Sequence, residues 1–113
     1  MESAESYCMA LSAVPDEEVG RRIAQRLLEA RAAACVNLVP GLESRYWWKG
    51  EIQRDSEALL LIKTSWDRVE AVEKLLLEAH PYETPELIIL PLSRGSAGYL
   101  NWLAAELNAG GSG

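Results

Sequence analysis

The feature that most limits the fold is the order in which strand-like and helix-like segments follow one another. Short apolar runs of strand length alternate with longer segments whose apolar residues recur every three or four positions. The predicted strands are residues 7–14, 34–39 continued by 44–48, 51–64 and 87–92. The predicted helices begin near residue 15 and end near Ala33, run from 66 to 79, and run from 97 to 107. The order is therefore strand, helix, strand, strand, helix and strand, followed by one further helix.

This order matches the split βαβ motif of ferredoxin-like domains. In that α+β arrangement, four strands form one antiparallel sheet and both long helices pack on the same face of it. A chain of 113 residues is long enough for one such domain and too short for two, so residues 1–109 are expected to form a single domain. The last four residues, Gly-Gly-Ser-Gly at 110–113, are expected to be a flexible tail.

Individual residues predict where the segments begin and end. Pro15 and the acidic residues after it favour the first turn of a helix, and Ser65 is predicted to cap the second helix. His80-Pro81 is expected to end that helix, because proline disfavours the helical conformation in the residue before it. Three glycine-containing dipeptides predict breaks in extended structure: an interruption at Pro40-Gly41, a tight hairpin turn at Lys49-Gly50 and a turn at Arg94-Gly95.

The second and third strands form a long hairpin whose tip carries Tyr46, Trp47 and Trp48. The 15 residues from Ala34 to Trp48 reach roughly 50 Å at about 3.3 Å each, whereas a compact domain of this length is roughly 35 Å across. The tip is therefore expected to overhang its own domain and to expose an aromatic patch that monomers rarely tolerate. We predict a symmetric homo-oligomer in which each hairpin lies on a neighbour. The alternative is that one tryptophan covers a helix end and the other is half exposed.

Charge and hydropathy argue against several classes of function. The net charge of −6 disfavours a nucleic-acid partner, because phosphate binding needs clustered lysine and arginine. No apolar run of roughly 18 residues is present, so no membrane span is expected. The N-terminal residues lack the basic and apolar regions of a secretory signal, which predicts a cytoplasmic protein. Cys8 and Cys35 are expected to be small buried hydrophobes, since a disulfide would be unusual in that compartment.

His80, the only histidine, is the first candidate for a binding role. Glu83 and Glu86 follow it closely, and a mixed nitrogen and oxygen donor set suits Cu(II), Ni(II) or Zn(II). Cys35 is a candidate further donor. One chain offers too few firm ligands for a closed site, so adjacent subunits would have to contribute. The alternative is that His80 only ends a helix, where it interacts with the helix dipole and the last carbonyls.

Catalysis is not expected of this chain. With one histidine and no Ser-His-Asp or Cys-His spacing, a catalytic triad has no basis in the sequence. Neither G-x-G-x-x-G nor a P-loop is present. The sequence therefore predicts a binding or structural protein.

Four segments taken together resemble one family. They are ACVNLVPGLESRYWWKGEI, LLIKT, HPYETPELIILPL and GYLNWL, and the resemblance extends in this order from about Met9 to Leu107. In them the chain is similar to the CutA (CutA1) family of divalent-cation tolerance proteins. The resemblance implies a ferredoxin-like subunit, a tight homotrimer in which long hairpins embrace neighbouring subunits, and a link to tolerance of divalent metals, copper above all.

The resemblance also gives the candidate residues a place in an assembly. The residues expected at the trimer interface are Tyr46, Trp47, Trp48 and Trp102. Lys63, in the LLIKT segment, is expected near Glu86 or Tyr82, where Lys63 and Tyr82 would line a cleft between subunits. Three interpretations stay open. The first is a trimer that binds copper or another divalent metal without needing it to fold. The second is a sensor, similar to PII proteins, with a small molecule in the inter-subunit clefts. The third is a structural or adaptor trimer without a ligand.

Overall fold

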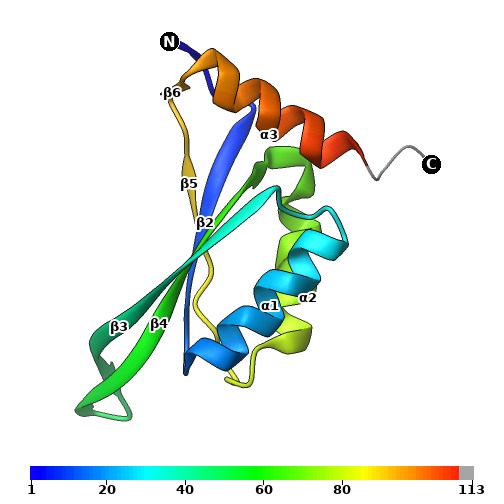
Figure 1. Ribbon diagram of the computed structural model, residues 1–113. Helices are drawn as coiled ribbons and strands as arrows, with labels where there is room; N and C mark the ends of the chain where they lie inside the picture. The colour runs from blue at the N-terminus through cyan, green and yellow to red at the C-terminus, as the bar shows by residue number, and fades with distance from the viewer. Residues whose placement is uncertain (110–113) are drawn as a thin grey trace.

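Four antiparallel strands form the main sheet, in the spatial order β3-β4-β2-β5 (Figure 1). These strands are β2 (Tyr7–Val14), β3 (Cys35–Trp48), β4 (Glu51–Ser65) and β5 (Ile88–Pro91). Helices α1 (Glu17–Glu29) and α2 (Val69–Ala79) lie on the same side of this sheet. The predicted ferredoxin-like arrangement is thereby confirmed. The structure is a computed structural model that describes residues 1–109, and the predicted tail at 110–113 lies outside the described residues.

The hydrophobic core lies between the sheet and the two helices. Every second residue of β2 is buried, as expected for a strand that turns one face to a core. Gly20 lets α1 approach the sheet closely, because a Cβ there would come within 2.8 Å of the Leu38 side chain. The core residues are Ala10, Val14, Val19, Ile23, Leu27, Ala32, Ala33, Ala58, Leu60, Ile62, Val72 and Leu76.

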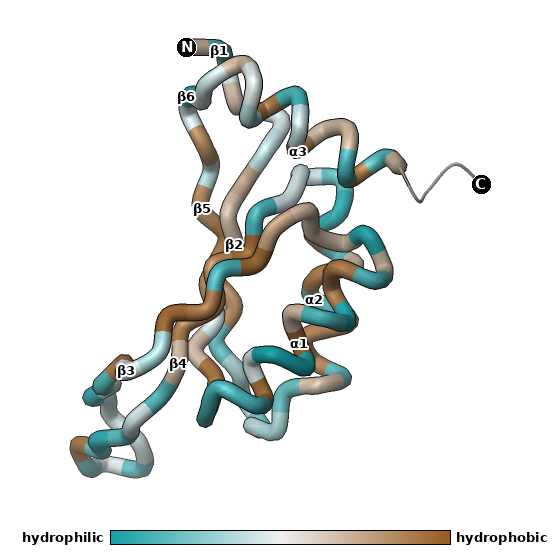
Figure 2. The backbone as a smooth tube through the Cα atoms, in the orientation of Figure 1, coloured by the Kyte–Doolittle hydropathy of each residue, from teal (hydrophilic) through white to brown (hydrophobic). Residues whose placement is uncertain are grey.

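The sheet face opposite the helices is also apolar. Its apolar residues lie on β2, β4 and β5, next to Lys63, which is the β4 partner of Met9. We call these apolar residues the open sheet face: Met9, Leu11, Leu59, Leu61, Ile88 and Leu90. Ile88 is 49% exposed and Leu90 is 39% exposed. The uncovered face of an antiparallel sheet is usually polar, so this face has the composition of a surface that another molecule covers. In Figure 2 the hydrophobic colouring is concentrated where the strands cross.

The first helix begins with a cap and ends earlier than the sequence suggests. The Asp16 side chain accepts a hydrogen bond from the Val19 amide at 2.9 Å, so Pro15 precedes the cap and is not part of the first turn as predicted. The helix ends at Glu29 and not near Ala33. Arg31 adopts a left-handed backbone with φ of 55°, which terminates the helix without a glycine.

The hairpin of β3 and β4 is continuous, which corrects the predicted interruption at Pro40-Gly41. The pairing shifts register between Val39 and Leu42, so the dipeptide forms a β-bulge within one strand. At the tip, Lys49 and Gly50 have φ values of 51° and 81°. A positive φ at both positions is the requirement of a type I′ turn, and the predicted tight turn is confirmed.

The hairpin gives the molecule an elongated shape, as predicted. Its Cα radius of gyration is 14.9 Å and its extents are 45 × 30 × 21 Å, whereas a compact chain of this length would have a radius of gyration of about 13 Å. Figure 1 shows the ends of β3 and β4 projecting beyond α1 and α2. The aromatic tip therefore has no support from the helices of its own subunit.

Two local predictions about the second half of the chain are wrong, those for Ser65 and for Arg94-Gly95. Ser65 is the last residue of β4, and its hydroxyl donates to the Asp67 carboxylate without capping a helix. A 3-10 turn at Trp66–Arg68 then precedes α2. Arg94–Gly95 is not a turn but the short strand β6, which pairs with β1 (Glu2–Ser3). The fourth strand, Ile88–Pro91, lies within one residue of its predicted bounds at each end.

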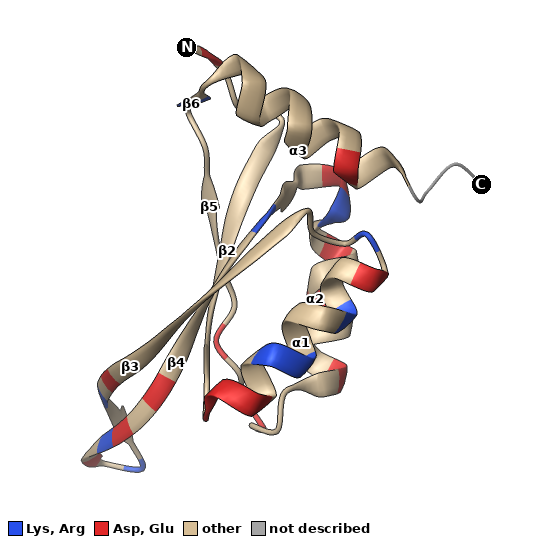
Figure 3. Ribbon diagram, viewed as in Figure 1, with Lys and Arg blue, Asp and Glu red and all other residues tan. Residues whose placement is uncertain are grey.

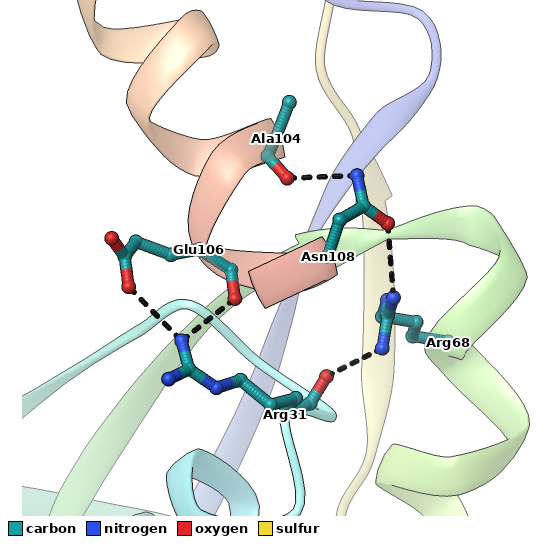
Figure 4. Close-up of polar contacts among 5 residues, drawn as sticks. All are labelled: Arg31, Arg68, Ala104, Glu106 and Asn108. Atoms are coloured by element: carbon teal, nitrogen blue, oxygen red, sulfur yellow. Dashed lines mark hydrogen bonds and ion pairs between the residues drawn. The ribbon is translucent and has the colours of Figure 1, made fainter. Parts of the chain in front are cut away.

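The C-terminal helix α3 (Ala97–Ala109) is held at one end of the sheet by two arginines (Figure 4). Arg31 Nη1 donates to the carbonyl of Glu106 at 2.8 Å and to its carboxylate at 3.0 Å. Arg68 donates to the Arg31 carbonyl at 2.8 Å and to the Asn108 side chain at 3.3 Å. These contacts connect α3 to the ends of α1 and β4. No helix within residues 1–109 is both long and apolar enough to cross a membrane.

Candidate functional site

A cleft lies where the hairpin leaves the sheet, beside the loop that follows α2. Its volume is about 630 Å³. It is lined by Ala13, Ser44, Arg45, Tyr46, Trp48, Asp55, Glu57, Tyr82, Glu83, Thr84 and Glu86. Figure 3 shows acidic segments on the half of β4 that approaches the hairpin tip. The site therefore combines carboxylates and aromatic rings from segments distant in sequence.

His80 fixes the start of the loop that forms one wall. Pro81 ends α2 as predicted, and the His80 ring turns to the edge of β2. Its Nε2 is 2.9 Å from the Ala13 carbonyl, and its Nδ1 accepts from the Tyr82 amide at 3.2 Å. These partners place the proton on Nε2 and occupy the lone pair of Nδ1. The side chain is buried, with 6% exposure. Its ring bonds to a strand and not to the last carbonyls of the helix.

Tyr82 connects this loop to β4. Its ring lies 4.7 Å from the His80 ring, measured between centroids. Its hydroxyl donates to Glu57 Oε2 at 2.8 Å. Burial and this hydrogen bond to the Glu57 carboxylate raise the pKa of Tyr82. The phenol therefore stays protonated and acts as a donor to Glu57.

Two further contacts place the carboxylates. Glu86 Oε1 accepts from the Ala13 amide at 2.9 Å, and the Glu86 carbonyl accepts from the buried Ser12 hydroxyl at 2.7 Å. Tyr46 donates to Asp55 across the hairpin. The hydrogen bond to Asp55, more than burial, raises the pKa of Tyr46. Each of these carboxylates keeps one oxygen that has no protein partner among the contacts of residues 1–109.

Not every predicted site residue lies at this cleft. Tyr82, Glu83 and Glu86 line it. His80 bonds to the carbonyl of Ala13, which also lines it. Cys35 pairs with Lys63 on β4, whereas Ala13, which contacts His80, pairs with Leu59. Lys63 and Leu59 are four residues apart, which is about 13 Å along the strand. Cys35 is therefore not in the same group as His80.

Within one subunit Lys63 also lies away from Tyr82 and Glu86, so the predicted cleft would have to bring Lys63 of one copy to Tyr82 of another. Its ammonium is 5.6 Å from the centroid of the Tyr99 ring on α3. Cys8 is fully buried as predicted, and burial raises the pKa of its thiol. Cys35 is only partly buried.

The residues predicted at a trimer interface are exposed in the single subunit. Tyr46 is 41% exposed, Trp47 71%, Trp48 47% and Trp102 43%. Trp102 lies against Tyr99, with ring centroids 5.6 Å apart. A large apolar surface is thus present both on the hairpin and on α3.

Comparison with known proteins gives the same assignment from three directions. The model of the family described as CutA1 divalent ion tolerance protein matches residues 8–106. The chain belongs to the CutA1 family. A divalent-cation tolerance protein CutA from Pectobacterium atrosepticum is 45% identical over 97 residues, covering 86% of this chain and 88% of that protein.

Solved structures of the family share the fold. The divalent cation tolerance protein CutA1 of Thermus thermophilus superimposes with a TM-score of 0.84 at 46% identity, covering 86% of this chain and 94% of that one. CutA1 from Oryza sativa superimposes with a TM-score of 0.86 at 41% identity, covering 88% of this chain and 92% of that one. The names of these relatives connect the CutA1 family to tolerance of divalent cations.

A divalent metal does not fit one subunit alone. Within residues 1–109, no group of three or more histidine, cysteine, aspartate or glutamate side chains is arranged to hold a metal ion. Both His80 ring nitrogens are hydrogen-bonded, to the Ala13 carbonyl and the Tyr82 amide. One carboxylate oxygen of Glu86 accepts a hydrogen bond from the Ala13 amide. Any metal site of this CutA1 chain would need donors from a second copy.

Sequence reasoning missed Asp55 and Glu57, which are central to the cleft. Both lie on β4, in the stretch EIQRDSEALLL, where alternating charges are usual on an exposed strand. Their importance comes from Tyr46 and Tyr82, which reach them from other segments. The one local signal is that Glu57 directly precedes the buried run beginning at Ala58.

Proposed function

We propose that the chain works as a cytoplasmic homotrimer that binds divalent cations, copper(II) among them, and thereby contributes to metal tolerance. We assign the chain no catalytic activity. The observation that carries the assembly is the unsupported hydrophobic surface: an apolar open sheet face together with a projecting aromatic hairpin. Monomers rarely expose patches of this size, and a symmetric ring would cover them with copies of the same chain.

The cation-binding part of the proposal rests on the carboxylates of the cleft. Glu83 is exposed, and Glu86 keeps one oxygen free of protein donors among the described residues. Carboxylate oxygens bind divalent metals, but two side chains do not make a closed site. A neighbouring copy would supply the remaining ligands, which links metal binding to assembly. His80 would serve by holding the loop that carries Glu83.

The experiment measures assembly and copper binding in the same samples. Trp47→Ser removes the most exposed aromatic side chain of the hairpin, and Trp66→Ser removes a tryptophan that is 44% exposed but lies outside it. Sedimentation velocity is expected to show a trimer for the wild type and Trp66→Ser, and dissociation at micromolar concentration for Trp47→Ser. Calorimetry with Cu(II) is expected to show binding only where the trimer persists.

Variants of single donors separate the candidate ligands. Glu83→Gln is expected to weaken Cu(II) binding, whereas His80→Gln, judged on trimeric protein, is expected to leave it within a few-fold of the wild type. Glu73→Gln, which removes an exposed carboxylate from α2, is the matched control. Unchanged copper affinity in a dissociated Trp47→Ser protein would contradict a site shared between subunits.

A second candidate function is the sensing of a small molecule, as in PII-like trimers. The observation in its favour is the cleft of about 630 Å³, which is in the range of roughly 300–1,000 Å³ typical of small-molecule sites. A thermal-shift screen with organic ligands in the presence of a chelator tests it. Stabilisation without metal would support this candidate.

A further inference from the structure

The β-bulge of β3 consists of two residues, Pro40 and Gly41, that oppose the single residue Ala58 of β4. An extra residue of this kind bends the strand that carries it and increases the local twist. Gly41 has a φ of 74°, a left-handed conformation that glycine adopts without strain. A Cβ at this position would meet no atom within 4 Å. The backbone conformation of the bulge, and not crowding by neighbouring atoms, therefore favours glycine here.

The bulge lies at the point where the hairpin leaves the sheet. Ala58, opposite the bulge, is also the last residue of β4 that pairs with β2, through Val14. Between this point and the tip, β4 pairs with β3 alone, and Figure 1 shows the two strands diverging from the end of β2. A bend placed where the third strand ends sets the direction of the whole projecting part of the hairpin, residues 42–57.

A chain of hydrogen bonds connects the two sides of this bend. It begins at Ala13, the β2 partner of Leu59, whose carbonyl accepts from His80 Nε2 at 2.9 Å. The Tyr82 amide donates to His80 Nδ1 at 3.2 Å, and the Tyr82 hydroxyl donates to Glu57 Oε2 at 2.8 Å. Leu59 precedes the bend on the sheet side, and Glu57 follows it on the hairpin side. The loop after α2 therefore connects the sheet to the first residue of the projecting part of β4.

The contacts that hold this connection are shielded within one subunit. Glu57 is 9% exposed and His80 is 6% exposed, and contact with a neighbouring copy can only lower these values. The loop is also fixed to the end of β2 through Glu86, whose carbonyl accepts from the Ser12 hydroxyl at 2.7 Å and whose carboxylate accepts from the Ala13 amide at 2.9 Å. The hydrogen bond from Tyr82 to Glu57 thus ties the hairpin to a firmly held loop.

From the coincidence of the bulge with this chain of hydrogen bonds, we propose that the two form a braced elbow, which aims the hairpin at a neighbouring copy of the chain. The bulge supplies the bend, and the hydrogen bond from Tyr82 to Glu57 holds the bend at one angle. The inference rests on the proposed homotrimer and adds which residues of the subunit select that assembly. Neither the bulge nor the hydrogen bond has to contact the neighbouring copy for this role.

Removal of the bulge tests the elbow. Deletion of Pro40 removes the extra residue and leaves Gly41 opposite Ala58, with the strand pairs on both sides preserved. Pro40→Ala removes the proline ring but keeps the extra residue, and it is the matched control. Sedimentation velocity at micromolar concentration is expected to show a trimer for the wild type and for Pro40→Ala, and a smaller species for the deletion variant, with circular dichroism showing that this variant is folded.

The outcomes separate the elbow from the assembly itself. A deletion variant that forms the trimer as readily as the wild type would overturn the elbow and leave the homotrimer standing. A wild-type protein that sediments as a folded monomer would overturn the proposed homotrimer, whatever the deletion variant does.

The brace gives a second test, which decides the question if the deletion variant does not fold. Tyr82→Phe keeps the ring and the bulge but removes the hydroxyl that donates to Glu57. It is expected to raise the protein concentration at which half of the trimer dissociates by about fivefold or more. Thr64→Val, which removes a buried hydrogen bond to the Ala32 carbonyl six residues along β4 from Ala58, is the control for a general loss of stability. An unchanged dissociation midpoint in Tyr82→Phe, or an equal shift in Thr64→Val, would overturn the elbow.

Discussion

Replacement of Tyr82 by phenylalanine tests the connection between the loop and β4. The change removes only the hydroxyl that donates to Glu57 Oε2 at 2.8 Å, and Glu57 is left nine-tenths buried without a protein donor. A hydrogen bond to a charged group contributes about 1.5–3 kcal/mol, and the loss is larger when the remaining partner is buried. Tyr82 itself is 39% exposed, so water replaces part of the bond. We expect the free energy of unfolding to fall by about 1–2 kcal/mol.

Urea unfolding at one fixed protein concentration measures this loss, since an oligomer's stability depends on concentration. Tyr46→Phe is the matched control, because its hydroxyl also donates to a carboxylate, that of Asp55, in an exposed setting. A smaller loss is expected there. Combining Tyr82→Phe with Glu57→Gln should give less than the sum of the two single losses. A Tyr82→Phe protein as stable as the wild type, or no more affected than Tyr46→Phe, would refute the reasoning.

Three further predictions concern pH, a buried hydroxyl and a left-handed residue. The pKa of Tyr82 in the folded protein is raised above its ordinary value near 10, so the unfolded chain loses the Tyr82 proton first as pH rises. The free energy of unfolding of the wild type should therefore fall above pH 10 relative to that of Tyr82→Phe. Urea unfolding at a series of pH values should give a slope below the roughly 1.4 kcal/mol per pH unit of a fully shielded group. Thr64→Val removes the donor to the Ala32 carbonyl at 2.6 Å in a buried site and should cost about 1–3 kcal/mol in urea unfolding, with exposed Ser65→Ala costing less than about 0.5 kcal/mol. Arg31→Ala and Arg31→Gly both lose the contacts to Glu106. The backbone φ at position 31 is 55°, which glycine adopts more readily than alanine, so urea unfolding should find the glycine variant more stable by about 1 kcal/mol. The reverse order would contradict the left-handed backbone at this position.

The sequence predicted the elements that depend on local periodicity. The run Tyr7–Val14 and the hairpin turn at Lys49-Gly50 are found where the pattern places them, because alternation and turn chemistry are properties of adjacent residues. The resemblance to CutA1 in four sequence segments identified the family. Projection of the hairpin followed from strand length alone.

The errors arise where distant contacts decide the outcome. Arg31 ends α1 in a left-handed conformation that residues such as glycine usually adopt, and its side chain is held by Glu106 on α3. Arg94–Gly95 is extended because the N-terminal strand pairs with it. Neither contact is visible in a window of neighbouring residues.

The same limit applies to the candidate site. His80 was a reasonable ligand by residue type, but the Ala13 carbonyl and the Tyr82 amide occupy both ring nitrogens. Strand register places Cys35 and Lys63 away from His80 within one subunit, so the predictions that include them depend on a neighbouring copy. Glu57 was passed over because its burial depends on Tyr82, which is 25 positions away.

Sedimentation velocity of the wild-type chain at micromolar concentration tests the account most directly. The subunit mass is 12.5 kDa, and three copies give 3 × 12.5 = 37.5 kDa. We expect one folded species of that mass across a tenfold dilution, because the open sheet face and the aromatic hairpin need a neighbour to cover them. A folded species of 12.5 kDa under these conditions would show that a lone subunit tolerates this surface, and would contradict both the assembly and any site shared between subunits.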